Sequence, residues 1–316
     1  VYSWVYDAHR HGPEHLCVMR QLQLLFGTLQ LSKGPVRPKG ICIALGGTAE
    51  GLNWTQYDLE SIWAEFVSVE PLPAMQKIVN VICSCYNLCK TCKTKRARPD
   101  ELSHLNLRAE HPSIEAALQA YLTAELLTDK NQYKCSTCKA LRDVYLGVMI
   151  TELPTILLIQ MDRFVFDFDS MSINKRNNCV TFPLELDMTP FINTSFIEEP
   201  MKTTSQRETR EPEDDCEIED TKDENVYSLY GVICHVGLAN SGCHFACIKD
   251  IASGDWYKFD DSYVSRIDVQ VVQEMYGKEG SSKNAMMLFY RRKSCSSNVS
   301  FSDVPKRLLS DLNLTK

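Results

Sequence analysis

Four cysteines in two short pairs are the residues with the clearest chemical use in this sequence. They are Cys89, Cys92, Cys135 and Cys138. A tight turn within each Cys-x-x-Cys pair orients both sulfurs toward one ion, so two pairs can enclose Zn²⁺ in a closed tetrahedron. The pattern predicts one structural zinc site; four unliganded thiols or a redox pair are the alternatives. Cys83 and Cys85 lie nearby, but their spacing suits a shared site less well.

The sequence holds 14 cysteines among 316 residues. A chain of this length can build an apolar core without disulfides, and its first residues lack the pattern of a signal peptide. We therefore expect free thiols in a reducing compartment, cytoplasmic or nuclear. No apolar run reaches the roughly 18 residues that a membrane helix needs, so we expect no membrane partner.

The negative charge of the chain is concentrated in one segment. The net charge is -7, and residues 198–224 alone hold twelve acidic and four basic side chains. The rest is near neutral, so we expect no nucleic-acid partner. Residues 193–225 have few large apolar groups and cannot bury enough surface to offset the entropy of ordering. We interpret them as an acidic disordered insertion.

Hydrophobic periodicity predicts helices in the first half of the chain and strands in the second. Apolar residues recur at helical spacing in residues 17–31, 56–69 and 113–127, and Pro112-Ser113 gives the third helix a start signal. The predicted strands, which are short and apolar, are residues 143–150, 155–163, 227–236, 243–250, 255–260 and 285–291. The polar tail from residue 294 contains a predicted short helix at 304–309.

Four segments resemble motifs of the ubiquitin-specific proteases. Residues 131–138 (NQYKCSTC) resemble the zinc-finger hairpin of that family, and residues 153–164 (LPTILLIQMDRF) resemble its LPxxLxLxLKRF strand. Residues 181–188 (TFPLELDM) are similar to its FPxxLDM segment, and residues 256–265 (WYKFDDSYVS) to its WxxFDDxxVS strand. The resemblance covers roughly residues 1–292.

The resemblance implies an α+β, papain-like cysteine protease fold in which thumb, palm and zinc-binding fingers grip ubiquitin. The implied reaction is hydrolysis of ubiquitin isopeptide bonds by a cysteine thiolate, with a histidine base and no catalytic cofactor. The implied partners are ubiquitin or ubiquitinated proteins. We expect residues 1–192 to form the thumb, the fingers and part of the palm, and residues 226–293 to complete the palm, with the insertion (193–225) between them and a tail at 294–316.

The resemblance places the orienting acid of the triad at Asp260, with Asp261 assisting. The base position is altered, because the family reads Gly-His-Tyr where this chain has Cys243 in place of the histidine and His244 in place of the aromatic residue. Successive strand side chains point to opposite faces, so we expect the His244 imidazole to point away from the cleft. A local bulge would restore it as a displaced base. His235 is the other candidate, although its family counterpart is not the base.

The nucleophile of the family lies in an Asn-Thr-Cys-Tyr-Met-Asn box that precedes a Leu-Gln-x-Leu-Phe helix. This sequence contains no matching box, so we expect an N-terminally truncated domain without the nucleophile or the oxyanion-hole asparagine. Cys17 weakly imitates the box, but Arg20-Gln21 follow where Asn-Ser belongs. We therefore interpret Cys17 as a helix residue.

Part of the expected ubiquitin contact is retained. Residues 21–26 (QLQLLF) and 56–58 (QYD) fit one subgroup of the family in order and spacing. Gln56 and Asp58 match a QxD element whose carboxylate meets the arginine-bearing tail of ubiquitin. The glutamate that follows in the family is Ser61 here, which predicts weaker binding of that tail. An ordinary polar cluster at a helix start is the alternative.

Three functions fit these observations. The first is a deubiquitinase of which one segment is missing, and the second is a catalytically inactive relative that binds ubiquitin or a partner. The third is a zinc-stabilised scaffold that binds no ubiquitin. Cys243 and Ser61 favour the second, because truncation alone explains neither.

Overall fold

The computed structural model describes residues 18–32, 34, 36–45, 78–169, 171–194, 196–197, 224–239, 241–278 and 280–295. Several sequence predictions lie outside these ranges. They are Cys17, the helix at 56–69 with Gln56, Asp58 and Ser61, residues 198–223 of the acidic insertion, and the helix at 304–309.

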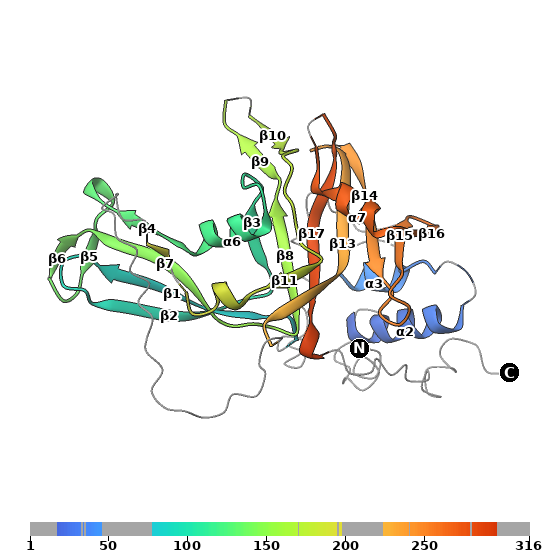
Figure 1. The fold of residues 1–316 in the computed structure, drawn as a ribbon, viewed down its shortest axis with the longest axis horizontal. Helices are drawn as coiled ribbons and strands as arrows, with labels where there is room; N and C mark the ends of the chain where they lie inside the picture. The colour runs from blue at the N-terminus through green and yellow to red at the C-terminus, as the bar shows by residue number, and fades with distance from the viewer. Residues whose placement is uncertain are drawn as a thin grey trace.

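A five-stranded sheet forms the elongated part of the molecule (Figure 1), and we call it the finger sheet. Its strand order is β12-β4-β7-β1-β2, and only the pairing of β12 with β4 is parallel. The strands are β1 (Val81–Cys89), β2 (Lys95–Leu102), β4 (Thr123–Leu127), β7 (Val144–Glu152) and β12 (Phe196–Ile197). A hairpin of β5 (Tyr133–Cys135) and β6 (Ala140–Arg142) stands at its tip.

An eight-stranded sheet, the palm sheet, forms the second body. Its strand order is β16-β15-β14-β13-β17-β8-β3, with β11 paired to β13. The strands are β3 (Leu105–Arg108), β8 (Ile156–Asp162), β11 (Glu185–Asp187), β13 (Val226–Leu238), β14 (Ser241–Lys249), β15 (Trp256–Asp260), β16 (Tyr263–Ile267) and β17 (Lys283–Arg292). A separate hairpin joins β9 (Phe164–Asp167) to β10 (Ser172–Lys175).

The described helices are short. The α-helices are α2 (Val18–Leu31), α3 (Lys39–Ala44), α6 (Ile114–Leu122) and α7 (Val269–Gln273). The 3₁₀ helices are η1 (Asp129–Asn131), η2 (Thr189–Phe191), η3 (Glu274–Tyr276) and η4 (Lys293–Cys295). None of the described helices has the length and apolar character needed to cross a membrane.

Helix α6 connects the two sheets through the main hydrophobic core. Ser113 caps its start by accepting a hydrogen bond from the backbone N–H of Ala116 at 3.2 Å. Ile114, Leu118 and Leu122 lie four residues apart and are fully buried, so one apolar face of the helix packs inward. The core cluster around them includes residues of β3, β8, β13 and β17.

The helix predicted at 113–127 ends at Leu122, and the residues that follow form β4. Leu126 pairs with Tyr145 of β7, and Ala124 is buried against Tyr145 and Tyr86. Cross-strand pairing and burial outweigh the helix propensity of this segment, because local propensity is a weak preference that tertiary contacts override.

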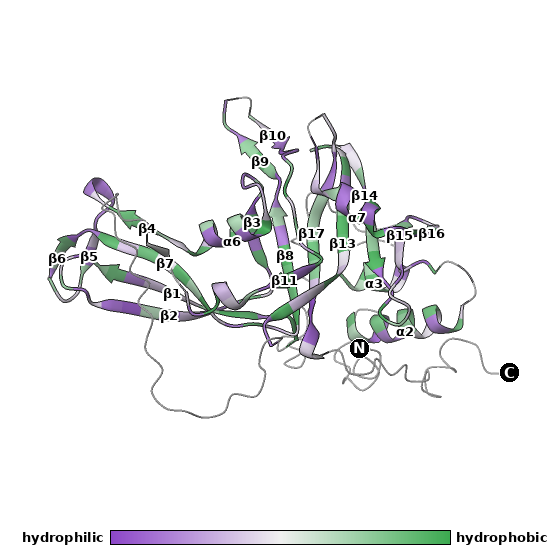
Figure 2. Cartoon of the chain, viewed as in Figure 1, coloured by the Kyte–Doolittle hydropathy of each residue, from purple (hydrophilic) through white to green (hydrophobic). Residues whose placement is uncertain are grey.

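The predicted strands are confirmed as β7, β8, β13, β14, β15 and β17, each within a few residues. Strands β1 and β2 have no counterpart in the sequence predictions. Figure 2 shows hydrophilic colour along β2, and its sequence KRARPDEL has no alternating pattern. It is extended because it pairs with β1 from Val81↔Leu102 to Leu88↔Lys95.

One face of the finger sheet turns toward α6, and we call it the inner finger face. Leu146, Val148 and Ile150 share a face of β7 because strand side chains alternate. Ile150 is fully buried in the core cluster that contains α6 residues, whereas Leu146 is 46% exposed. The inner finger face therefore runs from a buried base beside α6 to an exposed apolar surface.

The buried side chain of Arg163 links β17 to the segment that follows β10 by hydrogen bonds. Its side chain is 1% exposed, and its Nε donates a 2.6 Å hydrogen bond to the carbonyl of Ala285 in β17. Its Nη1 donates to the carbonyls of Arg176 at 3.1 Å and Asn178 at 2.9 Å. Burial lowers the pKa of Arg163 to about 10, so the guanidinium remains a cationic donor at neutral pH.

Candidate functional site

Two turns of the same form present the finger cysteines. Cys89 ends β1 and Cys135 ends β5, and each begins a Cys-x-x-Cys turn. The residues after the second cysteines, Lys93 and Lys139, have positive φ of 57° and 56°. Left-handed backbone costs a side-chain-bearing residue roughly 1–2 kcal/mol. Both pairs thus adopt the same strained turn, which folds the second thiol back toward the first.

The four thiols converge on one point. The sulfurs of Cys89, Cys92, Cys135 and Cys138 all lie within 4.8 Å of one another, and the Sγ atoms of Cys92 and Cys135 are 3.6 Å apart. Zn–S bonds of about 2.3 Å require sulfurs about 3.8 Å apart in a tetrahedron. The predicted pairs therefore meet, and their donor set is compatible with a closed structural zinc site.

Hydrogen bonds within this cluster lower the pKa of some of its thiols and raise that of another. Hydrogen bonds with the side chain and backbone of Thr94 lower the pKa of Cys92 to about 6. Hydrogen bonding to Cys92, followed by burial, raises the pKa of Cys138 to about 12. The backbone N–H of Cys138 points at the Sγ of Cys135, 3.5 Å away, and lowers the pKa of that thiol. The protein environment therefore already favours thiolate at part of the cluster.

Asp260 ends β15 on a face that also carries Cys243, where the resemblance predicts the base position. Lys258 Nζ donates a 2.6 Å hydrogen bond to Asp260 Oδ2. Lys258 pairs with Cys247 of β14, and its ammonium lies 4.5 Å from the centroid of the Phe245 ring. Alternation along β14 places Cys243 on the same face. We call this surface of Cys243, Phe245, Lys258 and Asp260 the acid face.

His244 projects from the opposite face of β14. It lies across from His235 of β13, and the two ring centroids are 4.9 Å apart. The register between β13 and β14 is continuous along their whole described pairing. A base role for His244 stays a prediction, and it requires β14 to shift by one residue before the imidazole can reach Asp260.

The imidazoles of His235 and His244 lie in a cationic, buried environment. The Phe164 ring meets His235 edge-on at 5.4 Å, and Lys175 Nζ donates to the carbonyls of His235 at 3.2 Å and Gly237 at 3.4 Å. Burial, then Lys175 and His244, lowers the pKa of His235 to about 4. Burial and Lys175 also lower the pKa of His244. Both rings are therefore neutral at neutral pH.

Two glycines set the geometry of the β13–β14 hairpin. Gly237 has φ of 124°, a conformation that residues with a side chain rarely adopt. A Cβ atom on Gly242 would lie 2.4 Å from His235 Nε2. The close packing of Gly242 against the His235 ring thus fixes which side chains of β14 face His235 and which face Asp260.

Asp261 lies in the exposed turn between β15 and β16. Its φ is 51°, and Asp260 pairs with Tyr263 across the turn. Aspartate tolerates this left-handed conformation better than most residues. The assisting role of Asp261 stays a prediction, as do the roles of Gln56 and Asp58. The contact of Lys258 with Asp260 was not predicted, although residues two apart in a strand share a face.

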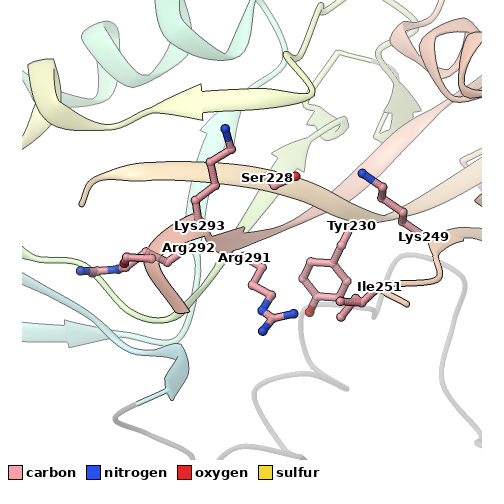
Figure 3. A pocket seen from close by; sticks show the side chains of 8 residues that line it. Ser228, Tyr230, Lys249, Ile251, Arg291, Arg292 and Lys293 are labelled. Carbon is pink, nitrogen blue, oxygen red and sulfur yellow. The ribbon is translucent and has the colours of Figure 1, made fainter. Parts of the chain in front are cut away.

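A basic pocket of about 420 Å³ lies elsewhere on the palm sheet (Figure 3). Side chains of Tyr230, Lys249 and Arg291 line it, together with Arg292 and Lys293. Lys293 also forms a 2.7 Å ion pair with Glu185. The pocket adjoins the start of β13, whereas Cys243 of β14 pairs with Val236 near the end of β13. The pocket is therefore separate from the acid face.

The sequence profile of the ubiquitin carboxyl-terminal hydrolase family matches residues 4–290. Ubiquitin carboxyl-terminal hydrolase 47 of Xenopus tropicalis is 28% identical over 95% of this chain and 26% of the relative. The human protein of the same name is 27% identical over 96% of this chain and 26% of the relative. Hydrolase 15 of Saccharomyces cerevisiae is 27% identical over 84% of this chain and 21% of the relative. The chain spans about a quarter of the length of the relatives it matches.

A solved structure of the yeast SAGA DUBm contains a chain of similar fold. Its TM-score is 0.52 at 22% identity, covering 68% of this chain and 41% of that chain. The likeness and the family match confirm the predicted fold class, with its mixture of helices and strands. Because the family profile extends over nearly the whole sequence, this chain belongs to the ubiquitin carboxyl-terminal hydrolase family.

Proposed function

We propose that this chain binds ubiquitin or ubiquitinated proteins on a deubiquitinase fold but does not hydrolyse isopeptide bonds with the residues it contains. The acid face carries this proposal. At the predicted base position this chain has the thiol of Cys243, which alternation along β14 puts on the same face as Asp260, whereas the His244 imidazole projects from the other face. Among the described residues, no imidazole shares the acid face with Asp260.

The chemistry of acyl transfer explains why this arrangement matters. The base must take the proton from the attacking thiol and return it to the leaving amine, and imidazole does both near neutral pH. Asp260 orients and stabilises an imidazole but cannot replace it.

The inner finger face is our proposed contact for the globular part of ubiquitin. Leu146 is 46% exposed there, and an exposed apolar side chain on a rigid sheet is suited to docking a folded partner. A structural zinc ion belongs to the same proposal. Cys89, Cys92, Cys135 and Cys138 would hold it, and the ion would crosslink the turns that shape the finger tip.

An activity-based probe tests the absence of catalysis. We expect no covalent adduct when the chain is incubated with ubiquitin vinyl sulfone and analysed by intact mass spectrometry. The Cys243→Ser variant is the control, because a slow adduct confined to Cys243 would disappear in it. Robust labelling of the parent chain at any cysteine, together with release of a fluorophore from ubiquitin, would overturn the proposal.

Calorimetric titration with ubiquitin tests binding separately. We expect saturable binding that weakens by about tenfold or more in Leu146→Glu, because a charge on the inner finger face must be desolvated. Ile251→Glu is the matched control, since Ile251 is similarly exposed at 49% but lies beside the basic pocket. No binding by the parent chain at millimolar ubiquitin would favour the scaffold interpretation instead.

An active deubiquitinase is the second candidate function. It is favoured by the retained Asp260 and by the position of His244 only one residue from the base position. It requires a nucleophile and a one-residue shift of β14. The distinguishing result is probe labelling that is lost in His244→Ala and retained in His235→Gln.

A further inference from the structure

Three metal-ligating side chains meet in the fingers away from the four-cysteine site. Cys83 and Cys85 are two residues apart in β1 and therefore share one face of that strand. Asp100 of β2 pairs in register with Cys83. The ligand atoms of the three side chains all lie within 4.8 Å of one another. We propose that Cys83, Cys85 and Asp100, the Cys83 cluster, bind a second Zn²⁺ ion.

The separations within the cluster are close to those of a zinc site. Cys85 Sγ lies 3.9 Å from Asp100 Oδ2, and no two of the three ligand atoms are more than 4.8 Å apart. The Cys83 thiol donates a hydrogen bond to the backbone carbonyl of Asp100 at 3.6 Å, which metal binding would break. Zn–S bonds of about 2.3 Å and Zn–O bonds of about 2.1 Å place tetrahedral ligands about 3.5–3.8 Å apart. Side-chain rotation is sufficient to close the site, because β1 and β2 already hold the backbone in place.

The cluster lies at the base of the inner finger face. Cys83 is opposite Ile150 of β7 and is 1% exposed, whereas Cys85 and Asp100 are half-buried. An ion can therefore enter from the Cys85 side.

Two thiols and a carboxylate that meet at one point supply three anionic ligands once the thiols are deprotonated, which suits a divalent cation. Zinc binding must displace the thiol proton, but the ion then neutralises all three ligands together. Arg98 pairs with Cys85 on the same face and is exposed, so its long side chain can extend into solvent away from the ion.

The donor set selects the class of ion. Thiolates favour Zn²⁺, whereas Mg²⁺ and Ca²⁺ take oxygen ligands. Three protein ligands leave a fourth position for water, unlike the closed four-cysteine site. Cys89 is four residues further along β1 than Cys85, which is about 13 Å of extended strand. The two ions would therefore occupy independent sites.

Metal stoichiometry of the whole chain tests the second site. The chain is purified with one equivalent of zinc in excess, and unbound metal is removed by gel filtration. We then expect elemental mass spectrometry to find two zinc ions per folded chain. Cys85→Ser should reduce the content to one, and Asp100→Asn should weaken the affinity of the second ion by at least about tenfold in chelator competition. The variant Cys138→Ser should lose the ion of the four-cysteine site and retain the ion of the Cys83 cluster.

Cobalt substitution gives a readout that does not depend on stability. The first and second equivalents of Co²⁺ should both produce thiolate-to-metal charge-transfer absorbance, and Cys85→Ser should remove only the part due to the Cys83 cluster. Cys179→Ser, which removes an exposed thiol, should leave both equivalents in place. One zinc ion per chain that Cys85→Ser does not affect would overturn the proposal while leaving the four-cysteine site intact.

Discussion

In the fingers, four cysteines from two hairpins converge within 4.8 Å, whereas in the palm His244 and Asp260 project from opposite faces of adjacent strands. The finger cysteines sit in turns, where a few backbone angles aim each sulfur. The palm residues sit in strands, where the direction of a side chain depends on whether its number is odd or even. A site in a turn tolerates small shifts along the chain, but a site in a sheet is lost when a residue moves by one position.

Loss of the zinc ion that we propose for the four finger cysteines should have the largest effect. Structural zinc contributes about 10–16 kcal/mol to folding in isolated zinc-finger peptides, so Cys135→Ser should unfold the finger tip. We expect fast amide exchange in β5, β6 and the end of β1, with the palm sheet still protected. Exchange measured by mass spectrometry checks this, and Cys179→Ser is the control. Unchanged protection of β5 and β6 would show that the turns hold without metal.

Acid should destabilise the palm through its buried histidines. The folded-state pKa of His235 is depressed to about 4, so the unfolded chain binds more protons below its ordinary pKa of about 6.5. His235 therefore makes stability fall as pH decreases from about 6.5 to 4, by up to about 3 kcal/mol. Urea unfolding across this range should show a shallower pH slope in His235→Gln. Equal slopes would contradict a neutral, buried His235.

Cys243→His should place an imidazole on the acid face. Because Asp260 shares that face, we expect its carboxylate to raise the pKa of the introduced imidazole. The pKa in Cys243→His should be about one unit higher than in the double variant Cys243→His, Asp260→Asn, which corresponds to about 1.4 kcal/mol. The pKa of His244 should not respond to Asp260→Asn. NMR titration of the ring protons checks both expectations, and a response of His244 alone would show that the faces are the reverse of those described.

Lys258→Met should have the smallest effect. The Lys258–Asp260 ion pair is short at 2.6 Å, but both side chains are partly exposed. Such pairs contribute between 0 and about 1 kcal/mol. We expect a change in unfolding free energy within that range, measured by urea denaturation at low and high salt. A loss of several kcal/mol would mean that the acid face is far less accessible to water than its exposure indicates.

The features that the sequence predicts well are those with a local pattern. The Cys-x-x-Cys spacing predicts the finger cluster because each turn is built from four consecutive residues. The strands β8 and β17 are predicted because their apolar residues are continuous, as expected of strands buried in the core. The roles given to Cys243 and Asp260 come from the family resemblance and stay predictions, although alternation along β14 does separate Cys243 from His244.

The features that the sequence does not predict depend on pairing between distant segments. Residues 123–127 continue a helical pattern, yet they form β4 because β7 supplies partners. β2 has no strand pattern and is extended only because β1 pairs with it. The Cys83 cluster has the same origin: alternation in β1 aligns Cys83 with Cys85, but only the β1–β2 register brings Asp100 to them. Pairing of that kind has no local signal.

The position of β8 has a consequence for the synthesis of the chain on the ribosome. β8 lies between β3 and β17, and Leu158 pairs with Phe289, which is translated much later. Until β17 emerges, one edge of the apolar β8 strand has no partner, and such an edge readily pairs with other chains. We expect nascent chains that end before residue 283 to depend on chaperones, because the palm sheet is completed only by its last strand.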